Sequence, residues 1–324
     1  MDVFVHILIF AAAVGVVWFF AGVLIDAVSS ISRRYCKSGF LTAFFILGFL
    51  TSISEFSVAS NSVLAGVPGV SVGNLIGASF VILLFITPLL AIAGKGIHLN
   101  GAISKGMLAI MLLAIALPVL LVLDGNVTKT EGVLALLAYG TIGYALYRKR
   151  APIRLCEPSE ERVMDQIRLT ISDGGKIVLG GIIIFIAAHF LVEQAVYFAT
   201  VLSVPASLVG LLMLSLGTNI PEIVIAFRSI FRGRSDIAFG DYLGSAAMNT
   251  LIFGGLAVAS GTFVLEASEF IMTAALLVVG LAFLFIFAGT RLTVSRKEAC
   301  FLLFFYGAFL VLQIWNVVRF AGDK

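Results

Sequence analysis

Long apolar runs separated by short polar, glycine- or proline-containing stretches dominate the chain. A bilayer core of about 30 Å needs roughly 20 apolar residues per helix, so each run of that length predicts a membrane-spanning helix. The pattern predicts ten such helices, near 3–28, 38–65, 69–93, 103–123, 131–147, 177–202, 205–231, 236–260, 268–290 and 299–318. Several connections are very short, so we expect neighbouring helices to be antiparallel.

Lys and Arg residues divide unevenly between the two faces that these ten helices define. One face receives eighteen of the 21, seven of them between Arg148 and Lys176, and the other receives only Lys129, Arg319 and Lys324. Cytoplasmic loops carry the excess of positive charge in membrane proteins. We therefore expect a multi-pass protein of the plasma (inner) membrane, with both termini outside and a cytoplasmic 148–176 loop.

The composition agrees with a membrane protein. The chain is 60% hydrophobic and 12% charged, with a mean hydropathy of +1.13. These values exclude a soluble enzyme, a nucleic-acid binder and a disordered chain. Cys36, Cys156 and Cys300 fall near the predicted cytoplasmic face and match neither a disulfide nor a metal pattern. The first apolar run is too long for a signal peptide and is expected to be retained as a helix.

An internal repeat divides the chain in half. Shifted by 167 residues, 51–84 matches 218–251 without gaps at nine of 34 positions. Each half holds five predicted helices, an odd number, so the second copy must cross the membrane in the opposite sense. We predict an all-α integral membrane protein with ten transmembrane helices as two inverted five-helix repeats, 1–147 and 177–324, and a substrate site near the midplane between them.

Two acidic residues occupy equivalent positions of the repeat, deep inside predicted spans. These are Glu55 in the second helix and Glu222 in the seventh. A carboxylate at such depth costs on the order of 3 kcal/mol or more unless it is protonated or paired with a cation. No Lys or Arg is predicted at a matching depth, so the neutralising partner is expected to be a bound metal ion or protons. A protonated structural Glu is the alternative for either residue taken singly.

Oxygen-bearing side chains accompany both glutamates. Helical spacing places Thr51 and Ser52 beside Glu55, and Thr218 and Asn219 repeat that arrangement beside Glu222. Hydroxyl, carbonyl and carboxylate oxygens are the ligands that hard cations such as Ca²⁺ and Na⁺ prefer.

Proline distinguishes the two copies. Pro221 is expected to release the carbonyl of Gly217 from helical hydrogen bonding, whereas Ser54 stands at the equivalent position of the second helix, so that helix is expected to be less interrupted.

Other polar and small residues have a structural interpretation. Gly73, Gly77, Gly240 and Gly244 are expected to allow close helix packing. Asp26, Glu193 and Asp241 lie near predicted helix ends, where a solvated role is favoured over a functional one. The three histidines are scattered and no hydrolase or metalloprotease motif is present, so the chain is not expected to be an enzyme.

The motifs around both glutamates resemble those of the calcium/cation antiporter superfamily, which includes the sodium/calcium exchangers. The second copy reads Gly-Thr-Asn-Ile-Pro-Glu over 217–222, then Asp-Ile-Ala-Phe-Gly over 236–240 and Gly-Ser over 244–245, close to the family pattern G-T-S-L-P-E, then D-I-A-x-G-N-x-x-G-S-N. The resemblance implies that Glu55 and Glu222 hold the transported ion. It also implies that their partners are Thr51, Ser52, Thr218 and Asn219, with Ser245 and Asn249 contributed by helix eight. Ala78, Ile82 and Ala246 depart from the pattern.

The resemblance predicts a secondary active antiporter that exchanges Ca²⁺ against Na⁺ or H⁺. Exchange of another divalent cation with protons, and cation binding without transport, remain alternatives. One divalent or two monovalent cations would balance two glutamates, so we expect a coupling simpler than three sodium ions per calcium ion. Inorganic cations and the lipid bilayer are the expected partners, and no cofactor besides the transported cations is expected.

Overall fold

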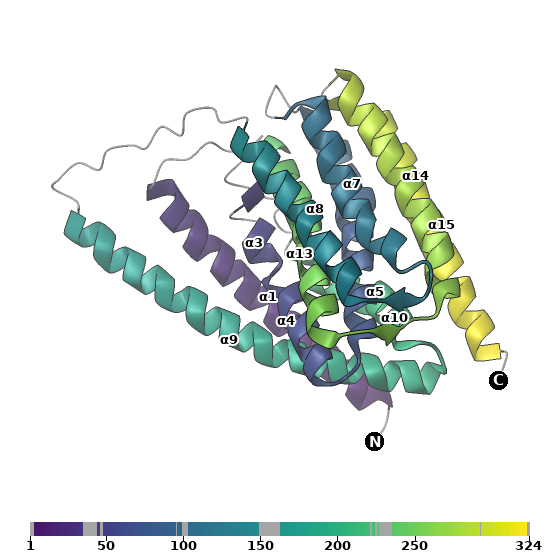
Figure 1. The fold of residues 1–324 in the computed structure, drawn as a ribbon. Helices are drawn as coiled ribbons and strands as arrows, with labels where there is room; N and C mark the ends of the chain where they lie inside the picture. The colour runs from purple at the N-terminus through teal and green to yellow at the C-terminus, as the bar shows by residue number, and fades with distance from the viewer. Residues whose placement is uncertain are drawn as a thin grey trace.

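The computed structural model describes residues 3–34, 44–45, 48–94, 96–98, 103–148, 163–220, 222–223, 226, 235–291 and 293–322. Helices account for nearly all of this part of the chain (Figure 1). In chain order they are α1 (Val3–Arg34), α3 (Gly48–Thr51), α4 (Ile53–Leu64), α5 (Pro68–Val81), the π-helical turn η2 (Ile82–Ile86), α6 (Thr87–Ala93), α7 (Lys105–Leu121), α8 (Lys129–Arg148), α9 (Val163–Leu202), α10 (Ala206–Val209), the π-helical turn η4 (Gly210–Leu214), α11 (Ser215–Thr218), α13 (Ser235–Ser260), α14 (Ala267–Arg291) and α15 (Arg296–Gly322). Every predicted apolar run therefore contains helix.

Six helical segments of the described chain are long and apolar enough to cross a membrane. They are Val3–Phe20, Pro68–Ala93, Ser172–Leu202, Ala238–Ser260, Phe270–Gly289 and Arg296–Arg319, while Lys105–Leu121 and Ala206–Thr218 are apolar but shorter. The protein is thus a mostly helical, multi-pass membrane protein.

Apolar side chains cover the outside of the helical assembly, and polar side chains gather within it. Phe19, Leu113 and Phe304 are more than 60% exposed, whereas Thr51 and Asn74 are fully buried. This distribution is the reverse of that in a protein folded in water, because lipid solvates the outer apolar surface and the polar groups satisfy one another inside.

The first span of the second half starts earlier than predicted. Helix α9 begins at Val163, so residues 163–176 of the predicted 148–176 loop are helical, and 149–162 lie outside the described residues. A Lys176–Asp173 ion pair of 2.9 Å, three residues apart, lies in this added part of α9. Helical hydrogen bonds form without apolar side chains, so a helix can extend beyond the run that predicts it.

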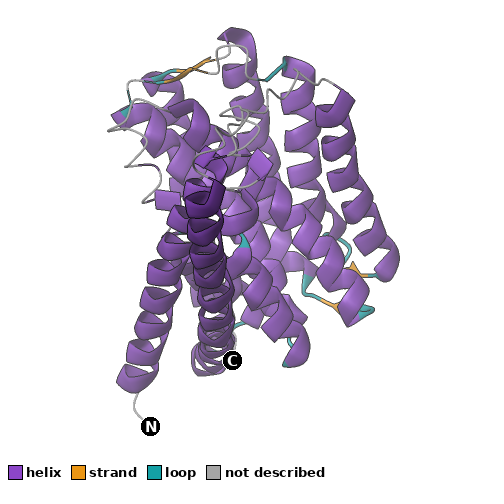
Figure 2. Cartoon of the chain, turned by 90° about the vertical axis from the view of Figure 1, so that its left-hand side faces the viewer, coloured by secondary structure: helices purple, strands orange, loops and turns teal. Residues whose placement is uncertain are grey.

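Two antiparallel strand pairs lie at opposite ends of the helical assembly (Figure 2). Strands β1 (Ile97–His98) and β4 (Thr293–Val294) pair at one end, with Ile97 opposite Val294. Strands β2 (Asn126–Val127) and β3 (Phe263–Val264) pair at the other, with Asn126 opposite Val264. A shift of 167 residues carries β2 onto β4 and carries Ile97 of β1 onto Val264 of β3. Segments that correspond in sequence thus lie at opposite ends of the fold.

The two ends of the chain lie on one side of the assembly. Helix α1 starts and α15 ends at the lower end of Figure 1, while α8 ends toward the upper end and α9 begins at the left-hand edge. The long helices α1 and α9 pack side by side on the left, with the Phe10 and Phe198 rings 6.1 Å apart, and α14 and α15 form the right-hand side. Helices α5 and α13 lie between these two pairs.

Candidate cation site

Two helical segments are interrupted at equivalent residues. Helix α3 ends at Thr51 and α4 begins at Ile53, so Ser52 forms a turn between them, and α11 likewise ends at Thr218 with Asn219 in a turn. Ser52 has φ −78° and ψ 5°, and Asn219 has φ −94° and ψ 11°. The interruptions bring hydroxyl, amide and carbonyl oxygens to the places where the two glutamates lie.

The first of these interruptions is the tighter one. The amide of Phe56 donates to the Ser52 carbonyl over 2.9 Å, whereas the equivalent bond from Ile223 to Asn219 measures 3.4 Å. The Ser54 hydroxyl is 3.0 Å from the Thr51 carbonyl oxygen. Pro221 itself lies outside the described residues, so the release of the Gly217 carbonyl stays a prediction.

Both glutamates are buried among groups of the opposite repeat. Glu55 is 1% exposed and Glu222 is fully buried. Thr218 lies beside Glu55, Thr51 lies beside Glu222, and the two carboxylates are close enough for their charges to repel. The structure therefore brings together residues more than 160 positions apart in the chain.

Helix α13 completes the site from the second repeat. The Ser245 and Thr51 hydroxyl oxygens are 2.6 Å apart, so Ser245 lies where the resemblance implies. The amide of Asn249 donates to the Ser79 hydroxyl of α5 over 3.2 Å. The Tyr242 hydroxyl donates to the Glu222 carbonyl over 3.2 Å, which joins α13 to the chain that follows α11.

A third buried carboxylate, Asp241, lies in this region and was misjudged from sequence. The expectation of a solvated helix end is wrong, because Asp241 is fully buried and lies beside Thr51, close enough to Glu222 for their charges to interact. Two signals pointed to it. The repeat aligns Asp241 with Asn74, and the antiporter pattern has Asn after Gly240, so an acid stands where an amide is usual.

Several buried oxygens here have no hydrogen-bond partner within the described part of the chain. They are Oε1 of Glu55, both carboxylate oxygens of Glu222 and of Asp241, Oγ of Ser52, and the amide oxygens of Asn219 and Asn249. Buried polar groups are nearly always hydrogen-bonded, and an unpaired buried acid is costlier still. Such a group of oxygens fits a cation that they would coordinate.

No basic side chain neutralises these acids among the residues described. The ion pairs found there are Lys176 with Asp173 and, when the imidazole is protonated, His189 with Glu193, and neither pair includes any of the three carboxylates. No three His, Cys, Asp or Glu side chains of this part lie close enough to hold one metal ion together. An ion bound here would therefore take most of its ligands from hydroxyl, amide and backbone oxygens, as Ca²⁺ and Na⁺ do.

Glycines bring the helices of the site into backbone contact. A methyl group added at Gly77 would collide with the carbonyl oxygen of Leu211, and one added at Gly244 would collide with that of Phe44. The two contacts are related by the 167-residue shift, as are Thr218 beside Asn74 and Thr51 beside Asp241. The prediction of close helix packing is confirmed for Gly73, Gly77 and Gly244.

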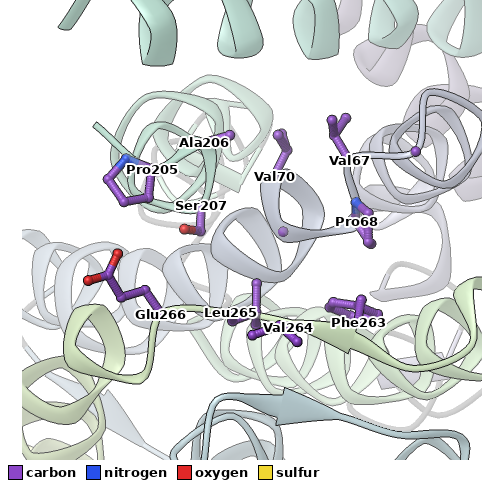
Figure 3. Close-up of a pocket in the computed structure, with 12 residues that line it drawn as sticks. Val67, Pro68, Val70, Pro205, Ala206, Ser207, Phe263, Val264, Leu265 and Glu266 are labelled. Carbon is purple, nitrogen blue, oxygen red and sulfur yellow. The ribbon is translucent and has the colours of Figure 1, made fainter. Parts of the chain in front are cut away.

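A separate cavity of about 430 Å³ lies at the end of the molecule where α4 meets α5 (Figure 3). The turns before α5, α10 and α14 line it, with Glu266 at one side. None of the three buried carboxylates lines it. Added methyl groups at Gly73 and Gly210 would collide with the carbonyls of Ser207 and Val70, so α5 and the α10–η4 segment close together beneath the cavity.

The fold matches solved exchanger structures. The sodium-calcium exchanger NCX_Mj, soaked with Na⁺ and Sr²⁺, aligns with a TM-score of 0.68 and 18% identity over 96% of this chain and 99% of that one. The H⁺/Ca²⁺ exchanger CAX aligns with a TM-score of 0.74 and 17% identity over 99% of this chain and 86% of that one. At these identities the matches concern the fold.

Similar sequences have been described in other organisms. Sodium/calcium exchanger MaX1 of Methanosarcina acetivorans is 34% identical over 143 residues, which are 43% of this chain and 40% of that protein. Inner membrane protein YrbG of Escherichia coli is 23% identical over 239 residues, 72% of this chain and 73% of that protein. The family profile described as sodium/calcium exchanger protein matches residues 5–148 and 175–315. This chain therefore belongs to the sodium/calcium exchanger protein family, whose members are transporters.

Proposed function

We propose that this protein is a secondary active antiporter that exchanges Ca²⁺ against Na⁺ or H⁺ at a site between two inverted repeats. One observation supports the proposal above all: Glu55 and Glu222, one from each repeat, are buried close enough for their charges to interact, and they have carboxylate oxygens that lack a hydrogen-bond partner among the described residues. Oxygen ligands of this kind select hard cations. Thr51, Ser52, Thr218, Asn219, Ser245 and Asn249 supply the remaining oxygens.

The proposed architecture has ten transmembrane helices, five in 1–147 and five in 177–324. Contacts that repeat at a spacing of 167 residues support the inversion, because the strand pairs related by this spacing lie at opposite ends of the fold. A chain with an even number of spans begins its first span and ends its last span on the same side of the membrane. The start of α1 and the end of α15 lie on one side of the assembly, which agrees with ten spans. The Lys and Arg distribution then places the termini outside and the 149–162 connection in the cytoplasm of a plasma (inner) membrane protein.

Transport by this site requires exposure to each side of the membrane in turn. The contact of Gly77 in α5 with Leu211 in η4 and the contact of Gly244 in α13 with Phe44 are equivalent under the repeat, and they lie on opposite sides of the glutamates in the proposed topology. Separation of one pair while the other stays closed would expose the ions to one side only.

Flux in reconstituted vesicles tests this function. The full chain should take up ⁴⁵Ca²⁺ when an outward Na⁺ gradient or a pH gradient is imposed, and the two gradients in separate arms identify the counter-ion. Glu55→Gln and Glu222→Gln should each abolish uptake, because neither amide can neutralise a cation. Glu193→Gln, at a side chain that is 53% exposed and therefore outside the buried site, is the matched control and should keep wild-type uptake.

Full uptake in either site variant would remove that glutamate from the ion-binding set. Uptake of Mn²⁺ or Mg²⁺ without Ca²⁺ would support the exchange of another divalent ion. Ca²⁺ binding at equilibrium with no flux under any gradient would identify a binding protein that does not transport.

A further inference from the structure

The two glutamates are held in different ways. The Ser54 hydroxyl donates to Oε2 of Glu55 over 2.8 Å, so only Oε1 of that carboxylate lacks a hydrogen-bond partner among the described residues. The residue equivalent to Ser54 is Pro221, whose side chain carries no donor, and both carboxylate oxygens of Glu222 lack a partner within the same part of the chain. The whole carboxylate of Glu222 is therefore available to a cation, and the residue must be held in place through other atoms.

The main chain beside Glu222 is bonded less tightly than the equivalent main chain of the first repeat. The amide of Ile223 donates to the Asn219 carbonyl over 3.4 Å, whereas the equivalent bond in the first repeat measures 2.9 Å. The carbonyl of Glu222 accepts a hydrogen bond from the hydroxyl of Tyr242 over 3.2 Å. Tyr242 of α13 thus holds the main chain of Glu222 without engaging its carboxylate.

Tyr242 has a defined position because the rest of its helix face is also bonded. It is fully buried, and it shares one face of α13 with Ser245 and Asn249 through i, i+3 and i+7 spacing. The Ser245 hydroxyl is 2.6 Å from that of Thr51, and the Asn249 amide donates to the Ser79 hydroxyl over 3.2 Å. This polar face is therefore fixed to both α3 and α5.

The first repeat has no counterpart of this polar face. The 167-residue shift aligns its three residues with Leu75, Ala78 and Ile82, which are apolar and at most 1% exposed. None of these side chains can donate a hydrogen bond to the main chain of Glu55. A hydroxyl on the adjacent residue serves Glu55 instead, whereas a hydroxyl from another helix serves Glu222.

We propose that Tyr242 is a positioning residue for ion binding, whose hydroxyl holds the main chain of Glu222 so that both carboxylate oxygens stay available to the transported cation. This inference rests on the proposed function. Ca²⁺ prefers many oxygen ligands and accepts both oxygens of one carboxylate. A protein whose binding-competent arrangement is only partly populated binds its ligand more weakly in proportion. Loss of the hydroxyl should therefore weaken Ca²⁺ binding, while Ca²⁺ once bound restores the arrangement.

Uptake of ⁴⁵Ca²⁺ into vesicles that contain the full-length protein, measured over a range of Ca²⁺ concentrations, tests this role. Tyr242→Phe removes only the hydroxyl, so the apparent KM for Ca²⁺ should rise about fivefold, as the loss of one hydrogen bond predicts. The maximal rate per folded molecule should stay near the wild-type value. 4-Aminophenylalanine at position 242 keeps a donor at the same end of the ring and should bring the KM back toward wild type.

Tyr306→Phe is the matched control for the loss of a hydroxyl. Tyr306 lies on α15 with its ring stacked on Phe85 at 4.7 Å, away from the polar face of α13, so its variant should keep the wild-type KM. A merely structural role for Tyr242 would lower the melting temperature or the maximal rate of Tyr242→Phe and leave its KM unchanged. That result would overturn the inference, as would a raised KM that 4-aminophenylalanine does not reverse.

A second variant keeps the inference testable if Tyr242→Phe does not fold. 4-Fluorophenylalanine at position 242 fills the space of the hydroxyl but donates no hydrogen bond, so it should show the raised KM, and an unchanged KM would overturn the positioning role. Failure of the proposed function would appear differently, as wild-type protein that takes up no Ca²⁺ under any gradient.

Discussion

The two repeats of this protein agree in how their helices pack and differ in the charges that they bring to the site. Gly77 against Leu211 and Gly244 against Phe44 are the same contact made twice, and Ser52 and Asn219 interrupt their helices at equivalent residues. Such packing depends on backbone approach, which tolerates little change.

The charged and polar side chains of the interior do not take part in this close backbone packing, and the two repeats differ in these side chains. Asn74 faces Thr218 in one half, whereas Asp241 lies beside Thr51 in the other. An amide and a carboxylate have nearly the same shape, so the exchange leaves the packing intact while it changes the charge. The comparison teaches that two repeats can share the same helix packing while the polar groups that they bring to the interior differ in charge.

Asn74→Asp would remove the charge difference between the repeats and should have the largest effect. The added carboxylate is fully buried beside Thr218, and an uncompensated acid at this depth costs on the order of 3 kcal/mol. We expect a lower melting temperature without cations and a larger stabilisation by added Na⁺ or Ca²⁺ than in wild type. Thermal unfolding monitored by size-exclusion chromatography would measure the melting temperature with and without cations. The control is the Asn74→Asp, Asp241→Asn double variant, which has the same net charge as the wild type.

Gly77→Ala and Gly244→Ala test whether the packing is truly equivalent. Each added methyl group meets a backbone carbonyl, and overpacking of this kind costs about 1–3 kcal/mol. Both variants should melt at lower temperatures by similar amounts. Gly255→Ala, on α13 with no atom within 4 Å of the added methyl group, should melt as wild type. Strongly unequal losses at Gly77 and Gly244 would show that the two contacts are not equivalent.

Thr51→Val and Thr218→Val separate the two hydroxyls at nearly constant volume. The Thr51 and Ser245 hydroxyl oxygens are 2.6 Å apart, whereas the Thr218 hydroxyl donates to the Asn74 side chain over 3.4 Å. The loss of Ca²⁺ binding free energy should therefore be greater for Thr51→Val than for Thr218→Val, by about 1 kcal/mol. The apparent affinity for ⁴⁵Ca²⁺ in vesicles would register the difference. Equal losses of affinity in the two variants, or a larger loss in Thr218→Val, would contradict the difference between the two repeats.

Glu193→Gln should have the smallest effect. Glu193 and His189 are 3.4 Å apart on α9, both side chains are more than half exposed, and neither belongs to the group of buried oxygens that forms the candidate site. Melting temperature and uptake should both stay near wild-type values. A marked loss of uptake would instead implicate α9 in ion movement.

Some of these features could be predicted from the residues in order. The apolar runs near 236–260 and 268–290 agree with α13 and α14 to within a few residues, because lipid demands a long apolar stretch wherever a helix crosses it. The start of α9 at Val163 was not predicted, since a helix outside lipid requires no apolar pattern.

The amino-acid sequence by itself determined the membrane class, the helical runs, the repeat and the six polar residues expected around the two glutamate positions, since these depend on composition and spacing along the chain, while the resemblance to the antiporter family added Ser245 and Asn249. Tertiary structure decided which oxygens face one another. Ser245 meets Thr51 from 194 positions away, and Asp241, which a one-dimensional pattern placed at a helix end, lies fully buried and close enough to Glu222 for their charges to interact. Depth and partner depend on how helices pack across the repeats, and that packing comes from glycine contacts whose consequences appear only in three dimensions.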